Sequence, residues 1–252
     1  MSKPKVGLQL IIYGRRAQQD LAAVLAEVAT AGYDGIEGGA PISQDQVDRI
    51  RAALEQAGLL CAGGHTGFSD LKDADAVKAR ARGVKALGGQ YLISSGGDWP
   101  DLDTFLRAGQ HMNEIGRWCR EEGVTFCYHN HHWEFKRFDG TVAYHAMMAA
   151  TDPLLVKLCP DVYWIHVGGE RPPEFISSYR DRCPYFHLKD GLGGDQYTEF
   201  RELGRGAVDL PAVLQAALSC QPEWIVVEQD STKVEPAESN RISRDYLRGL
   251  GV

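Results

Sequence analysis

Short apolar runs alternate with longer amphipathic segments along the whole chain. Eight runs have the length and apolar character of strands that are buried on both faces. They lie at residues 6–13, 33–37, 59–63, 91–95, 124–131, 155–161, 185–189 and 224–228. Each run precedes a segment whose apolar residues recur at helical spacing. These segments lie at residues 18–31, 43–57, 74–87, 102–122, 142–150, 172–179, 210–218 and 237–250.

Strict alternation of strands and helices predicts a parallel sheet joined by right-handed crossovers. Eight such units in 252 residues fit a single (β/α)8 TIM-barrel domain over residues 1–252, because this fold typically takes about 250 residues. An open doubly wound sheet is the competing fold, but the first strand runs into Tyr13-Gly14-Arg15-Arg16, which is not a glycine-rich phosphate loop. The longest connector, at residues 190–208, is predicted to be either a binding loop or a solvated connection.

Composition excludes several kinds of protein. A net charge of −7 repels phosphate backbones and argues against a nucleic-acid partner. No apolar run reaches the 18 or so residues of a membrane span, so we expect no membrane partner. The first apolar run ends at Arg15 and Arg16 and suits a strand better than a signal peptide. The six cysteines lack metal-like spacing and are expected to be buried thiols, so we expect a cytoplasmic protein.

Polar and charged side chains occur where the predicted strands end. They are Glu37, His65, His129, His131, Asp161, His187, Lys189 and Glu228. The carboxyl ends of the strands of a barrel surround one mouth, so these side chains are expected to converge. Converging carboxylates repel each other unless a cation neutralises them, and mixed oxygen and nitrogen ligands suit a divalent metal. We therefore expect Mn, Co, Mg or Zn as the cofactor.

Side-chain alternation in the fifth strand decides which residues can face the mouth. His129 and His131 share one face of an extended strand, and Tyr128 and Asn130 share the other. We predict that the two histidines face the mouth, because two polar imidazole rings would be buried without benefit if they faced the helix layer.

Further side chains are candidates for binding a substrate. Trp99 and Trp164 lie at or just beyond strand ends, and an aromatic face beside polar groups suits the C–H-rich face of a sugar. The alternative for each ring is a role in lining the loops. We predict substrate contacts for Trp99 and Trp164 together with Glu37, His65 and Arg205, the last in the glycine-rich connector.

The chain resembles the xylose-isomerase-like TIM-barrel superfamily. The resemblance rests on YDGIEGG (33–39), YHNHHWEF (128–135), FHLKD (186–190), ELGRGAVDLP (202–211) and VVEQD (226–230). That group includes sugar phosphate isomerase/epimerase-type proteins, ketose 3-epimerases, inosose dehydratases and the endonuclease IV group. The resemblance covers the whole chain in order and implies a site at the carboxyl ends of the barrel strands.

The resemblance also implies a set of metal ligands. The family takes Glu from strand five, Asp from strand six, His from strand seven and Glu from strand eight. Asp161, His187 and Glu228 match the last three positions. Where many members have Glu-x-His, this chain has His129-Asn130-His131, so His129 stands in place of the usual glutamate. A ligand is kept, but a carboxylate that the epimerases use as an acid/base group is lost.

The chemistry that we expect is proton abstraction next to a carbonyl, with a metal-stabilised enediolate. Glu228 is the first candidate for the base and is also a ligand. His131, Glu134 and Lys189 are candidates for the partner acid, and Lys189 also for stabilising an oxyanion. Glu134 or Glu37 would replace the lost carboxylate.

These expectations lead to a metal-dependent isomerase or epimerase acting on a keto sugar or sugar derivative. The alternative is a dehydratase or lyase acting on a 3-keto sugar or keto-inositol, which the loss of the glutamate at His129 keeps open. An endonuclease would need a basic DNA-binding face, which the net charge of −7 opposes. An inert sugar-binding barrel would need no stoichiometric metal. The resemblance implies a small sugar substrate and a homo-oligomer.

Overall fold

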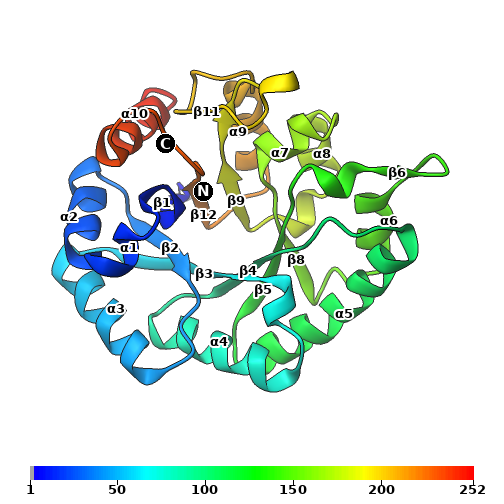
Figure 1. Ribbon diagram of the computed structural model, residues 1–252, viewed down its shortest axis with the longest axis horizontal. Coiled ribbons are helices and arrows are strands. Elements are labelled where there is room, and N and C mark those ends of the chain that lie inside the picture. The colour runs from blue at the N-terminus through cyan, green and yellow to red at the C-terminus, as the bar shows by residue number, and fades with distance from the viewer. Residues whose placement is uncertain (1–2) are drawn as a thin grey trace.

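The computed structural model describes residues 3–252, in which eight parallel strands form a nearly closed barrel with helices outside it (Figure 1). The strands are β1 (Lys5–Gln9), β2 (Gly35–Gly39), β3 (Leu60–Gly67), β4 (Tyr91–Ser95), β5 (Thr125–His129), β8 (Val156–Cys159), β9 (Tyr185–Leu188) and β12 (Trp224–Val227). Their order around the barrel is β8-β5-β4-β3-β2-β1-β12-β9. Each strand overlaps a predicted apolar run, and the (β/α)8 prediction is confirmed.

The barrel closes between β8 and β9 through one isolated parallel bridge, which pairs Asp161 with His187. At this seam the His187 amide donates to Pro160 O at 3.0 Å. All other neighbouring strands pair over three or more residues. The seam is therefore the most weakly paired part of the barrel.

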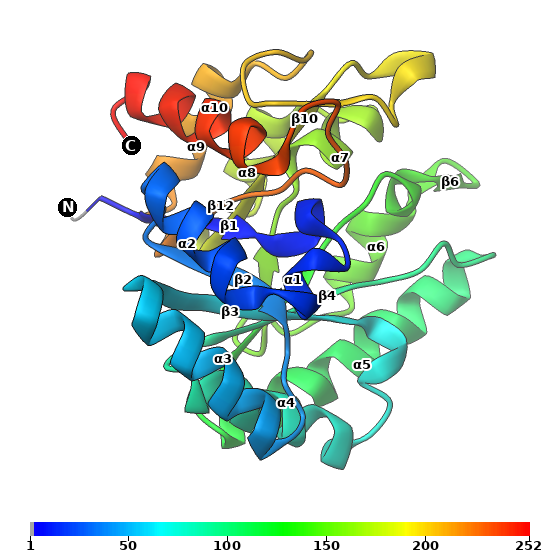
Figure 2. The same cartoon turned by 60° about the vertical axis from the view of Figure 1, so that its left-hand side comes forward.

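The helices surround the barrel in chain order. They are α1 (Arg16–Gln19), α2 (Leu21–Ala31), α3 (Gln44–Ala57), α4 (Ala74–Ala86), α5 (Leu102–Glu121), α6 (Ala143–Ala149), α7 (Val162–Val167), α8 (Pro172–Ser178), α9 (Leu210–Ser219) and α10 (Pro236–Gly249). Polar caps begin several of them: Ser43 forms a capping box with Gln46, and the Asp73 and Asp101 side chains accept from the amide three residues on. The last helix, α10, packs beside α2 and completes the ring (Figure 2).

Three local features differ from the predicted pattern. The first strand stops at Gln9, whose side chain accepts from Ile11 N and begins a 3-10 helix over Leu10–Tyr13. The predicted first helix is divided at Asp20, which caps α2. Helix α7 was not predicted, because VYWIHV is short, is apolar apart from His166 and shows no helical period.

Small elements occupy the loops at the carboxyl ends of the strands. They are the hairpins β6 (Arg137–Phe138) with β7 (Thr141–Val142) and β10 (Asp190–Gly191) with β11 (Phe200–Arg201). The predicted connector 190–208 is thus partly ordered by a hairpin. The buried Asp190 carboxylate also accepts backbone N–H groups from Gly204 and Gly206, both at 3.0 Å, and from Val208 at 3.2 Å.

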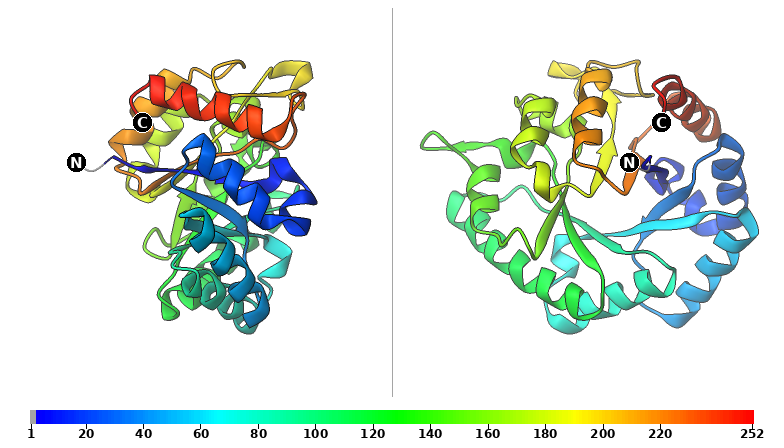
Figure 3. Two further views of the ribbon diagram at one scale, coloured as in Figure 1. Left: turned by 90° about the vertical axis from the view of Figure 1, so that its left-hand side faces the viewer. Right: turned by 180° about the vertical axis from the view of Figure 1, so that it is seen from behind.

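Side chains fill the interior of the barrel beneath its mouth. They are Ala62, Tyr91, Ile93, Cys127, Cys159, Tyr185, Trp224 and Val226. A larger apolar layer lies between the strands and the helices. Lys3 Nζ donates to Gly251 O at 2.8 Å, and Figure 3 shows that β1 begins near the end of α10. Among the described residues, no helix has the length and apolar character to cross a membrane.

Candidate functional site

Four predicted ligands meet at the mouth of the barrel. His129 ends β5, Asp161 follows β8, His187 lies in β9 and Glu228 follows β12. One nitrogen or oxygen atom from each lies within 4.8 Å of the others, and all four residues are buried. We call these residues the four-ligand cluster. Side-chain alternation produces it, because His129 and His187 lie two residues after the inward-facing Cys127 and Tyr185 of their strands.

Each member of the four-ligand cluster has a buried polar atom with no hydrogen-bond partner among residues 3–252. These atoms are His129 Nδ1, Asp161 Oδ2, His187 Nδ1 and Glu228 Oε2. His187 Nδ1 lies 2.6 Å from Glu228 Oε2 without hydrogen-bond geometry. Unsatisfied buried polar atoms are costly, and a shared divalent cation satisfies such a set. Two imidazole nitrogens and two carboxylate oxygens are a donor set that fits a divalent metal.

The second oxygen of Asp161 has a structural task. Asp161 Oδ1 accepts from Trp164 N at 2.9 Å and caps α7. Asn130 holds the same residue from β5, since its side-chain oxygen accepts from Asp161 N at 3.1 Å and its amide donates to Asp161 O at 3.3 Å. The backbone of Asp161 is therefore fixed, and only Oδ2 is free to act as a ligand.

Glu37 lies behind the cluster and is fully buried. His187 Nε2 lies 2.7 Å from Glu37 Oε2, which also accepts from Tyr185 OH at 2.8 Å. His65 Nδ1 lies 2.9 Å from Glu37 Oε1, and its Nε2 lies 3.2 Å from Ser95 Oγ. Burial acts to raise the pKa of Glu37, but His187 and His65 outweigh it and lower the pKa to about 2. The structure thus joins Glu37 and His65 to the cluster.

Lys189 lies against the cluster with a fully buried side chain. Its Nζ is 3.1 Å from Glu228 Oε1 and 3.9 Å from Asp161 Oδ2, and it contacts the carboxylate of Asp230. It also lies over the rings of Trp164, at 4.7 Å, and Phe200, at 4.8 Å. Burial acts to lower the pKa of Lys189, but the surrounding carboxylates outweigh it and raise the pKa.

Aromatic side chains form a wall beside the cluster. The His131 ring stacks on Trp133 at 4.1 Å and lies 5.0 Å from the His129 ring. Trp164 lies 5.8 Å from His131. The prediction that β5 extends to His131 was wrong, because the strand ends at His129. His131 nevertheless reaches the mouth through the turn that follows. Burial lowers the pKa of His131 to about 3.

Three predicted site residues lie away from the four-ligand cluster. Glu134 is fully buried, with Oε1 accepting from Tyr128 OH at 2.8 Å and Oε2 from His131 N at 2.9 Å. The Tyr128 side chain lies in the layer between strands and helices, so Glu134 is bound on that side of β5. Burial raises the pKa of Glu134 to about 7.

The other two are Trp99 and Arg205. Trp99 packs on Phe68 at 5.4 Å and on Phe105 at 5.0 Å, in an aromatic group beside α5. The Arg205 side chain is 55% exposed and pairs with Glu202 at 3.4 Å. These contacts are with residues outside the four-ligand cluster.

Three residues that were not predicted as site residues lie in or beside this group. Asp230 contacts Lys189, Tyr185 donates to Glu37, and the thiol of Cys159 lies within 4.8 Å of ligand atoms of His129 and His187. Tyr185 precedes His187 by two residues in the same strand, so the period of two could have identified it.

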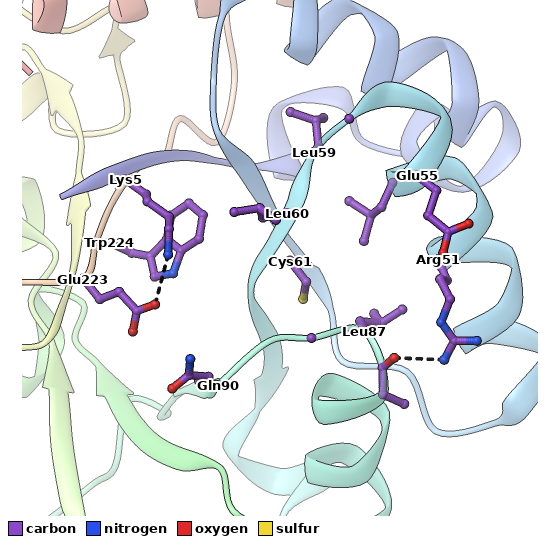
Figure 4. A pocket seen from close by; sticks show the side chains of 14 residues that line it. Lys5, Arg51, Glu55, Leu59, Leu60, Cys61, Leu87, Gln90, Glu223 and Trp224 are labelled. Carbon is purple, nitrogen blue, oxygen red and sulfur yellow. Dashed lines mark hydrogen bonds and ion pairs between the residues drawn. The ribbon is translucent and has the colours of Figure 1, made fainter. Parts of the chain in front are cut away.

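A cavity lies at the other end of the barrel from the cluster, and Figure 4 shows the side chains that line it. Its volume is about 610 Å³ and its lining includes Lys5, Leu60 and Trp224, which begin β1, β3 and β12. The amino-terminal ends of barrel strands are generally concerned with stability and not with catalysis. The cavity is separate from the cluster.

Comparison with known proteins identifies the family. Residues 25–250 match the family described as xylose isomerase-like TIM barrel. An inosose dehydratase of Geobacillus kaustophilus is 27% identical over 90% of this chain and 86% of its own. A sugar phosphate isomerase/epimerase structure from Parabacteroides distasonis has a TM-score of 0.84 at 22% identity, covering 97% of this chain and 98% of that one. The zinc-containing IolI protein structure has a TM-score of 0.76 at 15% identity, covering 98% and 97%. The chain therefore belongs to the xylose isomerase-like TIM barrel family.

Proposed function

We propose that the protein is a divalent-metal-dependent dehydratase that removes water from a polyhydroxylated ketone, such as a keto-inositol or a 3-keto sugar. The observation that carries the proposal is the pair formed by Lys189 and Glu228 beside the four-ligand cluster, with Nζ 3.1 Å from Oε1. The relative named inosose dehydratase supports the same reaction class. Sugar-modifying chemistry of this kind agrees with the family to which the chain belongs.

His129, Asp161, His187 and Glu228 would hold the metal. Their four buried and unpaired atoms support this assignment. A bound divalent ion supplies Lewis-acid polarisation of the substrate carbonyl, which makes the neighbouring C–H group more acidic. All further steps depend on side chains of the protein.

Glu228 and Lys189 would share the elimination. The Glu228 carboxylate takes the proton from the carbon next to the carbonyl. The Lys189 ammonium gives a proton to the β-hydroxyl group, which leaves as water while the carbon–carbon double bond forms. Glu228 then carries a proton and Lys189 has lost one, so a proton transfer across their 3.1 Å contact restores both groups.

The placement of the acid and the base favours elimination over epimerisation. Epimerisation needs two acid/base groups on opposite faces of the reacting carbon. The family resemblance implies a second glutamate at the position of His129, and Glu134 is bound to Tyr128 on the other side of β5. Lys189 Nζ and Glu228 Oε1 lie 3.1 Å apart, so an acid and a base are side by side, as the loss of H and OH from one face requires.

An isomerase or epimerase is the second candidate. The observation in its favour is His131, whose ring lies 5.0 Å from the His129 ring at the mouth of the barrel. His131 would then return a proton to the face opposite Glu228. The stacked rings of His131 and Trp133, with Trp164 and His65, would bind the apolar and hydroxyl-bearing faces of the sugar in either reaction.

Incubation with a keto-inositol and with a 3-keto glucoside in deuterated water separates the two reactions. The protein is first loaded with Mn, Co, Zn or Mg. A dehydratase gives an unsaturated ketone that absorbs in the ultraviolet, whereas an epimerase gives back deuterium-labelled epimers. The dehydratase proposal is abandoned if labelled epimers accumulate and no absorbing product forms. Glu228→Gln is the inactive control in both cases.

A further inference from the structure

The hydrogen bonds of Glu37 give it a role that neither its sequence position nor the family assignment reveals. It was expected to bind substrate, yet both oxygens of this buried side chain accept hydrogen bonds from groups of the protein. Three donors share its two oxygens, because Tyr185 OH and His187 Nε2 meet Oε2 while His65 Nδ1 meets Oε1. An ionised carboxyl group accepts about four hydrogen bonds. Glu37 therefore has little capacity left for a substrate.

We propose that Glu37 is the residue that positions His187 as a metal ligand. The inference rests on the metal site of the proposed function. His187 lies between two carboxylates, with Nε2 2.7 Å from Glu37 Oε2 and Nδ1 2.6 Å from Glu228 Oε2. A cation in the cluster would need an unprotonated Nδ1 as its ligand, so the proton of the neutral imidazole would be on Nε2 and would be donated to Glu37. The opposite tautomer would place a proton where the ligand atom is needed.

The hydrogen bond also fixes the plane of the ring. Ligating histidines usually donate their other N–H to a carboxylate or carbonyl, which orients the ring and makes the ligand more basic. Glu37 is itself held from two further directions, by Tyr185 and His65. Tyr185 precedes His187 by two residues in β9, so one strand carries both the ligand and a donor that anchors the ligand's partner.

The same carboxylate orients His65. Its ring lies 5.5 Å from the His129 ring and 6.1 Å from the His187 ring, and it is partly exposed at the mouth. Glu37 thus connects a group accessible to substrate with a group that faces the metal. A change at Glu37 should alter the metal site first, because His187 depends on it directly.

The test measures Co²⁺ binding to the whole protein. Affinity is determined by competition with a chromophoric chelator, and the visible absorption of bound Co²⁺ reports ligand geometry. Glu37→Gln keeps the size of the side chain and removes its charge. We expect Co²⁺ binding about 10–100-fold weaker, the usual effect of losing such a partner, together with a changed absorption spectrum.

Glu134→Gln is the matched control. Both glutamates are fully buried, and both accept from a tyrosine hydroxyl at 2.8 Å, but Glu134 does not touch the four-ligand cluster. Its variant should bind Co²⁺ within about twofold of the wild type and give the same spectrum. If Glu37→Gln does not fold, Glu37→Asp replaces it, since the shorter side chain withdraws the acceptor from Nε2.

A folded Glu37 variant that binds Co²⁺ with wild-type affinity and spectrum overturns the inference. The dehydratase proposal fails by a different result, namely that Co²⁺-loaded wild-type protein forms no unsaturated ketone. The comparison of Co²⁺ binding between the Glu37 variant and the wild type does not depend on catalytic activity. The two proposals are therefore tested separately.

Discussion

Asp161 and His187 are paired twice, once through their backbones and once through their side chains. Their backbones form the single bridge between β8 and β9, and their side chains both contribute to the four-ligand cluster. Closing the barrel and assembling the site are therefore one event at this position. A cation held by both side chains would reinforce the part of the barrel with the fewest strand hydrogen bonds.

Metal binding is expected to stabilise the fold. At a metal concentration 100 times the dissociation constant, the free energy of unfolding rises by about 2.7 kcal/mol, or roughly 5–10 °C in Tm for a chain of this size. Differential scanning calorimetry with and without a chelator measures the shift. Hydrogen exchange adds a local test, because the His187 amide at the seam should gain protection. Equal Tm values in both conditions would contradict the assignment of the cluster.

Asp161→Asn should remove metal without removing the helix cap. The asparagine oxygen still accepts from Trp164 N, as Asp161 Oδ1 does at 2.9 Å. The other oxygen, which is the free one, becomes an NH2 group that cannot act as a ligand. Loss of a residue that hydrogen-bonds to a metal ligand typically weakens metal binding about 10–100-fold. Loss of a ligand itself should weaken it by at least as much. Elemental analysis measures the metal and circular dichroism the fold; full occupancy in a folded variant would refute the ligand assignment.

Lys189→Met should separate catalysis from metal binding. The ammonium lies against Glu228 but supplies no electron pair to a metal. A lost general acid typically costs about 10²–10⁴-fold in rate, so kcat should fall by that factor while metal content stays at the wild-type level. Turnover of the keto-inositol is followed by ultraviolet absorption. Activity within tenfold of the wild type would exclude Lys189 as the acid.

Glu134 should make stability depend on pH. Burial raises its pKa from the ordinary 4.5 to about 7 in the folded protein, so the folded state holds a proton that the unfolded state releases. The group's contribution to stability is present below pH 4.5 and is lost as pH rises through 7, amounting to about 3 kcal/mol at most. Glu134→Gln removes this dependence. Urea unfolding of both proteins at pH 5 and pH 8 measures the difference.

That comparison isolates Glu134 from other titrating groups, because they are common to both proteins. The wild type should lose more free energy of unfolding than Glu134→Gln between pH 5 and pH 8. Equal losses would mean that Glu134 is ionised in the folded protein throughout, with Tyr128 OH and His131 N compensating for its burial.

The alternation of apolar runs was sufficient to predict the barrel, and strand ends were sufficient to predict the cluster. Asp161, His187 and Glu228 each follow or end a strongly apolar strand, so topology alone brings them together. Helix α7 escaped prediction because its sequence has no polar face. Asp161 caps this helix, and aspartate is a common N-cap residue, so the sequence could have indicated a helix start there as well as a ligand.

Side-chain partners could not be predicted from the sequence. Glu37 lies within β2 and is bound to His187, whereas Glu134 lies in the 3-10 helix after β5 and is bound to Tyr128. The face that Glu134 reaches depends on the turn that follows the strand. The period of two applies only within a strand, and β5 stops at His129, before the turn that places His131 and Glu134.

The Asp190 carboxylate has a consequence for how substrate enters. It accepts hydrogen bonds from the backbone N–H groups of Gly204, Gly206 and Val208. If this part of the connector moved outward, the buried carboxylate would lose these hydrogen bonds. This side of the entrance is therefore rigid. Specificity on this side of the entrance should therefore depend more on a preformed shape than on induced fit.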